Sequence, residues 1–91
     1  MLDEIFLMTD EEVWKLFGYR CIVCRQRGTD LNHIVPRSRS KFYKNDWKNK
    51  APLCGKHHDE YHLHGVTSEK IQTMQNLRKD FLISIGKEGY I

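Results

Sequence analysis

The sequence has few cysteines, few prolines and no long apolar run, and each scarcity narrows the class of protein. Its 91 residues include three cysteines and two prolines. An odd number of cysteines cannot close into a framework of disulfides alone, and Asp3 and Glu4 occupy the place where a secretory signal carries basic residues. We therefore expect reduced thiols and an intracellular, cytoplasmic protein. No apolar stretch approaches the roughly 18 residues of a membrane span, and the mean hydropathy of −0.64 predicts a soluble protein without a membrane partner.

The length of the chain predicts one small domain that needs help to be stable. A domain this short buries only roughly 60% of its unfolded surface, so a metal, disulfides or a partner usually stabilises it. Three cysteines and five histidines make a metal the leading candidate. Because repeats and Pro/Ser-rich linkers are absent, we expect a single domain over residues 1–91, with its core at 19–65 and helical flanks at 1–18 and 66–91.

The net charge of +3 conceals a strong asymmetry along the chain. Residues 1–19 carry five acidic side chains against one basic, a net charge of −4, whereas residues 20–50 carry nine basic against two acidic, a net charge of +7. Phe42, Tyr43 and Trp47 lie among these cations and offer flat rings that can stack on bases. The basic block favours a polyanionic partner, although lysine-rich loops that only keep a small protein soluble would have the same charge.

Two helices are predicted outside the basic block. Thr9 followed by Glu12 is typical of a capping box, which predicts a helix that begins at Asp10 and ends near Gly18. Residues 67–85 repeat apolar side chains near the helical period, with Thr67 or Ser68 as the cap and Gly86 as the stop. The positions expected to face the core are Val13, Trp14, Phe17, Ile71, Met74, Leu77 or Arg78, Phe81, Leu82 and Ile85.

Two ligand pairs with the same internal spacing predict a structural zinc site. Cys21 and Cys24 form a CxxC pair, and Cys54 and His57 form a second pair after 29 intervening residues. Zinc prefers four tetrahedral nitrogen and sulfur ligands, and a shell filled by protein leaves no position for substrate, so this site would be structural. The competing interpretation, a redox-active CxxC, would need a thioredoxin-like strand and helix around the pair, which the sequence does not provide.

A second group of histidines lies between and after these pairs. The alternating run at residues 31–36 predicts a strand that carries His33, and a helix is expected from Gly55 to His64. His58 and His62, four residues apart, would share one face of that helix and can bind one divalent ion.

These residues closely resemble the HNH endonucleases that have a ββα-metal fold. The resemblance covers residues 19–65, about half the chain. It is carried by the pair Cys21 and Cys24, the run Asn32-His33-Ile34-Val35-Pro36-Arg37, then Asn49, the run Leu53-Cys54-x2-His57-His58, and His62. The resemblance implies a small α+β protein, with a ββα-metal, treble-clef-like core stapled by zinc and flanked by an N-terminal and a C-terminal helix. A compact, free-standing HNH unit also resembles those of phages and mobile elements.

The resemblance also implies roles for individual residues. His33 would be the general base, Asn49 would brace the loop and orient His33, and His58 and His62 would hold a catalytic divalent ion such as Mg²⁺, Mn²⁺ or Ni²⁺. Asn32 would complete this site, where many members of the family carry an aspartate, glutamate or histidine. The neutral amide puts the affinity for metal, or the choice of metal, in question.

The function implied is metal-dependent hydrolysis of phosphodiester bonds in DNA, with RNA as the alternative substrate and no nucleotide cofactor. The chain would act as a monomer or a homodimer. The residues expected to contact nucleic acid are Arg37, Arg39, Lys41, Lys44, Lys48 and Lys50. The alternative function is a non-catalytic treble-clef zinc module that binds nucleic acid or protein.

Overall fold

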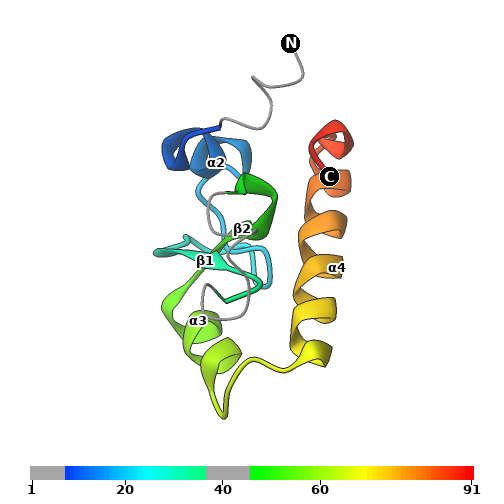
Figure 1. Ribbon diagram of the computed structural model, residues 1–91. Helices are drawn as coiled ribbons and strands as arrows, with labels where there is room; N and C mark the ends of the chain where they lie inside the picture. Colours follow the sequence, from blue (N-terminus) through cyan, green and yellow to red (C-terminus); the bar gives the residue numbers. More distant parts are fainter. Residues whose placement is uncertain (1–7, 37–45) are drawn as a thin grey trace.

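The computed structural model describes residues 8–36 and 46–91, which form three α-helices and one two-stranded antiparallel sheet (Figure 1). The helices are α2 (Asp10–Leu16), α3 (Gly55–His62) and α4 (Ser68–Ser84), the strands are β1 (Asp30–His33) and β2 (Lys50–Leu53), and the short 3₁₀ segments are η1 (Trp47–Asn49) and η2 (Glu88–Tyr90). The predicted small α+β class is confirmed.

Helix α2 begins where its capping residues predict. The amide of Glu12 donates to Oγ1 of Thr9 at 3.1 Å, and the amide of Thr9 donates to Oε1 of Glu12 at 2.9 Å, which completes the capping box. Val13 and Phe17 are buried, so one face of the helix joins the core. Gly18, with φ of 63°, follows the end of the helix in a left-handed conformation that glycine adopts easily.

The sheet is shorter than its sequence pattern indicates. Strand β1 pairs with β2 from Asp30 opposite Leu53 to His33 opposite Lys50. The predicted strand at residues 31–36 was therefore wrong beyond His33. The partner segment is the 3₁₀ turn η1 at this point, which cannot continue an extended ladder.

Helices α3 and α4 follow the sheet in sequence. Helix α3 ends at His62 rather than at His64, because His64 and Gly65 take positive φ values of 62° and 88°. Helix α4 begins after Thr67, whose side chain accepts a hydrogen bond from the amide of Lys70, as its sequence predicts. Among the helices in residues 8–36 and 46–91, none is long and apolar enough to cross a membrane.

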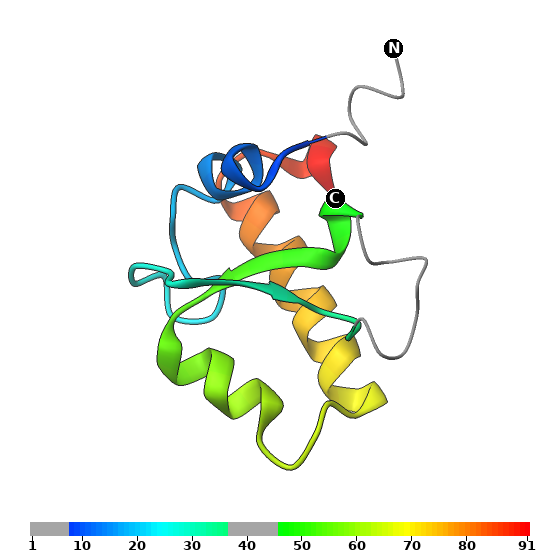
Figure 2. The same ribbon diagram turned by 60° about the vertical axis from the view of Figure 1, so that its left-hand side comes forward.

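Helix α4 lies along one side of the two strands, with α2 near its C-terminal end and α3 near its N-terminal end (Figure 2). One buried cluster joins these elements. It includes Val13 of α2 and the C-cap residue Phe17, Leu53 of β2, and Phe81 and Leu82 of α4. The helical flanks therefore share a core with the segment that carries the predicted ligands.

Two positions in the core differ from the predicted pattern. Ile85 is 38% exposed, so it does not face the core as expected. Arg78, which the periodicity left as an alternative to Leu77, is buried with its guanidinium 5.6 Å from the rings of both Phe17 and Trp47. Burial lowers the pKa of Arg78 to about 10, although the charge of Asp46 opposes this shift. The aromatic faces and the carbonyl of Tyr90, 3.3 Å from Nη2, stabilise this charge in the core.

Candidate functional site

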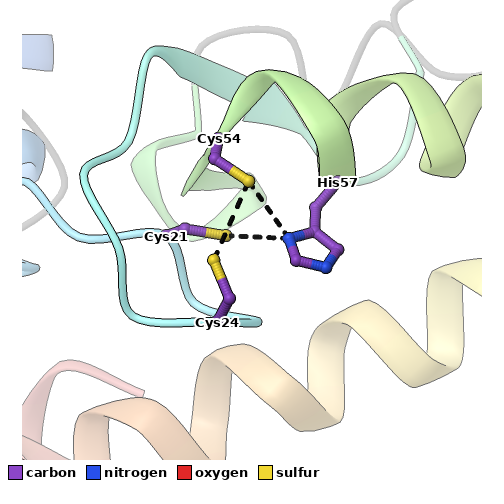
Figure 3. Close-up of side chains that lie close together, drawn as sticks. All are labelled: Cys21, Cys24, Cys54 and His57. Atoms are coloured by element: carbon purple, nitrogen blue, oxygen red, sulfur yellow. Dashed lines mark hydrogen bonds between the residues drawn. The ribbon is translucent and has the colours of Figure 1, made fainter.

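Cys21, Cys24, Cys54 and His57 converge on one point between the sheet and α4 (Figure 3). Their ligand atoms all lie within 4.8 Å of one another. The Sγ atoms of Cys24 and Cys54 are 3.8 Å apart, and Nδ1 of His57 lies 3.7 Å from Sγ of Cys21 and 3.1 Å from Sγ of Cys54. The four predicted ligands therefore form one group.

Local backbone structure explains this convergence. A turn brings the first pair together: Arg20 and Arg27 form an isolated β-bridge, and the amide of Arg25 donates to the carbonyl of Cys21 at 2.8 Å. Cys54 is the N-cap residue of α3, and His57 lies in the first turn of that helix. The second pair thus begins a helix and faces the turn that carries the first.

The geometry of the group fits zinc. Bonds of about 2.3 Å to sulfur and about 2.0 Å to nitrogen, at tetrahedral angles, place two sulfurs about 3.8 Å apart and a sulfur and a nitrogen about 3.5 Å apart. The 3.8 Å and 3.7 Å separations match these values, and the 3.1 Å separation is shorter by about half an ångström, as for a direct N–H to sulfur hydrogen bond. The Cys₃His cluster is therefore compatible with a zinc site.

The pKa shifts of the thiols are also consistent with a cation bound between them. Burial raises the pKa of Cys21, but backbone hydrogen bonds from Cys24, Cys54 and Val23 outweigh it, so the pKa lies below its ordinary value. A backbone hydrogen bond from Gln26 favours the thiolate of Cys24, yet partial burial and the neighbouring thiols raise its pKa. A cation between the sulfurs would relieve this competition, because it stabilises all the thiolates together.

A second group of predicted residues lines a separate cavity of about 280 Å³. Strand β1 contributes Asn32 and His33, and α3 contributes His58 and His62. Leu31 and Pro36 complete the lining. The structure thus brings together the four residues for which the sequence suggested a general base and a divalent-ion site.

Within this cavity, the polar atoms lie at ligand-like separations. Oδ1 of Asn32 is 3.1 Å from Nε2 of His62, and the ring centres of His58 and His62 are 4.7 Å apart. Burial lowers the pKa of His62, and the nearby His58 and Lys70 charges lower it further. This shift favours the neutral imidazole, which is the form that binds a metal ion.

Asn49 ties down the chain that follows His33. Its Oδ1 accepts from the amide of Val35 at 2.9 Å, its Nδ2 donates to the carbonyl of Val35 at 3.0 Å, and its own carbonyl accepts from the amide of Ile34 at 2.8 Å. The hydroxyl of Tyr61 donates to the carbonyl of Ile34 at 2.6 Å. These contacts fix the exit of β1 to η1 and to α3.

The predicted nucleic-acid contacts are only partly within the described residues. Arg37, Arg39, Lys41 and Lys44 lie outside them, as do Phe42 and Tyr43. The suggestion that Trp47 stacks on bases was wrong, because Trp47 is fully buried under Arg78 and the C-terminal Tyr90. Lys48 is exposed, whereas Lys50 places Nζ 2.6 Å from Oδ1 of Asp10, so part of its charge is already compensated.

Sequence reasoning missed Lys70. Its Nζ lies 2.6–3.3 Å from four carbonyl oxygens at the end of α3. Those carbonyls belong to Glu60, Tyr61, Leu63 and Gly65. A lysine at the start of one helix gives no local signal that it caps the previous one, because the contact depends on the loop between them.

Comparisons of the chain with protein-family models, with curated proteins and with solved structures found no match. The chemistry of the two clusters therefore has to be inferred from their own side chains. The Cys₃His cluster offers a closed set of soft ligands, and the cavity offers neutral nitrogen and oxygen donors beside a further histidine.

Proposed function

We propose that this protein is a metal-dependent endonuclease of the HNH type, with a ββα-metal, treble-clef-like core that a structural zinc ion holds together. The observation that carries the proposal is the position of His33 on the same cavity as Asn32, His58 and His62. The Cys₃His cluster has no need of these four residues. Their convergence from β1 and α3 is what a hydrolytic site requires and a purely structural zinc module does not.

His33 is the proposed general base. Hydrolysis of a phosphodiester needs a group that removes a proton from the attacking water, and an imidazole has an ordinary pKa near neutral pH. His33 is partly buried and lines the cavity, so one of its faces can meet a substrate there. The contacts of Asn49 with Val35 restrain the backbone just after His33 and make Asn49 its positioning residue.

Asn32, His58 and His62 are the proposed ligands of the catalytic divalent ion. An ion such as Mg²⁺, Mn²⁺ or Ni²⁺ supplies Lewis-acid stabilisation of charge on the phosphate and on the departing oxygen when bound. The residues fit such an ion, since one amide oxygen and one imidazole nitrogen already face each other at 3.1 Å. The pair of histidines on α3 keeps its orientation because Lys70 caps the end of the helix.

The proposed substrate is DNA, which the cations between residues 20 and 50 would hold by its phosphates without reading sequence. The structure describes five of these cations, and Lys48, which is exposed within η1, directly precedes Asn49 in sequence. Binding of this kind weakens as the salt concentration rises, because it depends on the release of counterions.

The proposal is tested with supercoiled plasmid and a matched RNA, incubated with the zinc-loaded protein and added Mg²⁺, Mn²⁺ or Ni²⁺. We expect nicking that depends on the added ion and is lost in His58→Ala and His62→Ala. His64→Asn is the matched control, since His64 lies outside the cavity and Asn tolerates its positive φ. Nucleic-acid binding without cleavage under any of the three ions would instead support the non-catalytic zinc module.

A further inference from the structure

Among the residues that the structure describes, the lining of the cavity between β1 and α3 contains no carboxylate, lysine or arginine. Its walls are Leu31, Pro36, one amide and three imidazoles. Divalent-ion sites usually include at least one carboxylate, which offsets part of the charge of the ion. The described lining therefore offers an incoming divalent ion nitrogen and oxygen donors but no carboxylate.

Asn32 contributes an uncharged amide to the proposed ion site, where an aspartate would contribute a negative charge. It is 3% exposed, and its Oδ1 faces Nε2 of His62 at 3.1 Å. Its Nδ2 has no hydrogen-bond partner in the part of the chain that the structure describes. An amide oxygen can only accept, so the position between Oδ1 and Nε2 takes either the proton of His62 or a cation.

The charges just outside the cavity do not replace the missing carboxylate. Asp59 lies 3.9 Å from Nδ1 of His58, but its side chain is 88% exposed and well screened by water. Lys70 places a positive charge beside His62, because its Nζ lies 3.1 Å from the carbonyl oxygen of Tyr61 and 2.6 Å from that of Leu63. The charges that the structure describes around the cavity therefore disfavour an isolated divalent ion.

We propose that Asn32 makes the binding of the divalent ion depend on a phosphate group in the same cavity. The inference rests on the proposed function, because it assigns a property to the proposed ion site. A phosphodiester or phosphate anion supplies both an oxygen donor and the negative charge that Asn32 lacks. The ion and the anion then strengthen each other's binding by the same factor, as linkage requires.

The consequence is a site that binds its ion more tightly when a substrate phosphate is present than when it is absent. An aspartate at position 32 would provide a permanent negative charge at the same place. It would tighten ion binding in the absence of phosphate, so that added phosphate would increase the affinity for the ion only slightly. Asn32 thus couples ion retention to the presence of substrate.

The experiment measures Mn²⁺ binding to the zinc-loaded full chain by the EPR signal of free Mn²⁺, with and without inorganic phosphate. Protein-free solutions correct for the Mn²⁺ that phosphate itself complexes, and chloride at equal ionic strength controls for salt. In the wild type we expect phosphate to raise Mn²⁺ affinity by about fivefold or more, within the usual range of coupling between two ligands. In Asn32→Asp we expect tighter binding without phosphate and less than about a twofold gain when it is added.

Asn76→Asp is the matched control, because it adds the same charge to α4 at an exposed position outside the cavity. It should behave like the wild type. Equal Mn²⁺ affinity of the wild type with and without phosphate would overturn the inference and leave the proposed ion site intact. If His58→Ala binds Mn²⁺ as the wild type does, or if the wild type binds none, the ion site itself is overturned, and the proposed function with it. The wild-type comparison needs no variant, so it decides the matter even if Asn32→Asp does not fold.

Discussion

Removal of zinc should unfold this protein completely. The Cys₃His cluster connects the turn at residues 21–24 to the first turn of α3, and Cys21 is fully buried in the main core cluster. A chelator that withdraws the ion would leave several thiols and an imidazole facing one another at 3.1–3.8 Å with no cation between them. The perturbation therefore acts on the core and on the helix that bears His58 and His62 at once.

The expected magnitude is comparable with the whole stability of a domain of this size. Structural zinc contributes about 10–16 kcal/mol of apparent binding free energy in small zinc-folded peptides at pH 7. The free energy of unfolding of small domains is only about 5–15 kcal/mol in total. Even the lower zinc value is comparable with that whole margin, so the metal-free chain should have no stable folded state at 25 °C.

The assay combines metal release with circular dichroism. A chromogenic chelator should recover about one zinc per chain, as a single four-ligand site requires, and the helical signal should disappear in step with release and return when zinc is restored. Cys54→Ser should behave like the chelated wild type, whereas His64→Asn should keep its zinc. A zinc-free chain that retained a cooperative thermal transition would refute the reasoning.

Three further predictions concern the supports of the site and of α2. Asn49→Ala strands both backbone groups of Val35 and should lower the free energy of unfolding by about 2 kcal/mol, with a fall in Tm on the order of 10 °C by calorimetry; a fall below about 3 °C would contradict this role. Lys70→Met removes the cation from the end of α3 and should cost about 1–2 kcal/mol in urea unfolding, with Lys70→Arg recovering part of it; equal stability of both variants and the wild type would exclude the cap. Backbone and side-chain hydrogen bonds with Thr9 lower the pKa of Glu12, so its contribution to stability is full above its unfolded pKa and is lost as pH falls through the lowered folded value. Comparison of Tm against pH for wild type and Glu12→Gln should show curves that converge in acid, and curves that stay parallel would count against it.

The elements defined by local contacts were predicted best. The capping box of α2 and the Thr67 cap of α4 each depend on residues within three positions of one another, so the sequence contains the whole interaction. The same holds for the Cys₃His cluster, since the spacing inside each pair is set by a turn or a helix start and only the meeting of the pairs is long-range.

The wrong predictions concern residues whose local sequence pattern is overridden by contacts with segments distant in sequence. The alternation at residues 31–36 predicts a strand, but the backbone at Val35 is taken by the side chain of Asn49, fourteen positions away in sequence. Trp47, which lies in the basic block of the sequence, is buried because Arg78 and Tyr90 of the C-terminal part of the chain pack against it. Such contacts have no signature in composition or periodicity.

The measurement that tests the central claim most directly is the rate of plasmid nicking by His33→Ala, compared with wild type and with His64→Asn under the same divalent ion. Zinc content and circular dichroism should be equal in all three proteins, so that a difference in rate reports on chemistry rather than folding. Because a general base contributes about 10²–10⁴ to a rate, we expect His33→Ala to nick at least about 100-fold more slowly, while His64→Asn stays within about twofold of wild type. Equal nicking by His33→Ala and wild type would contradict the account.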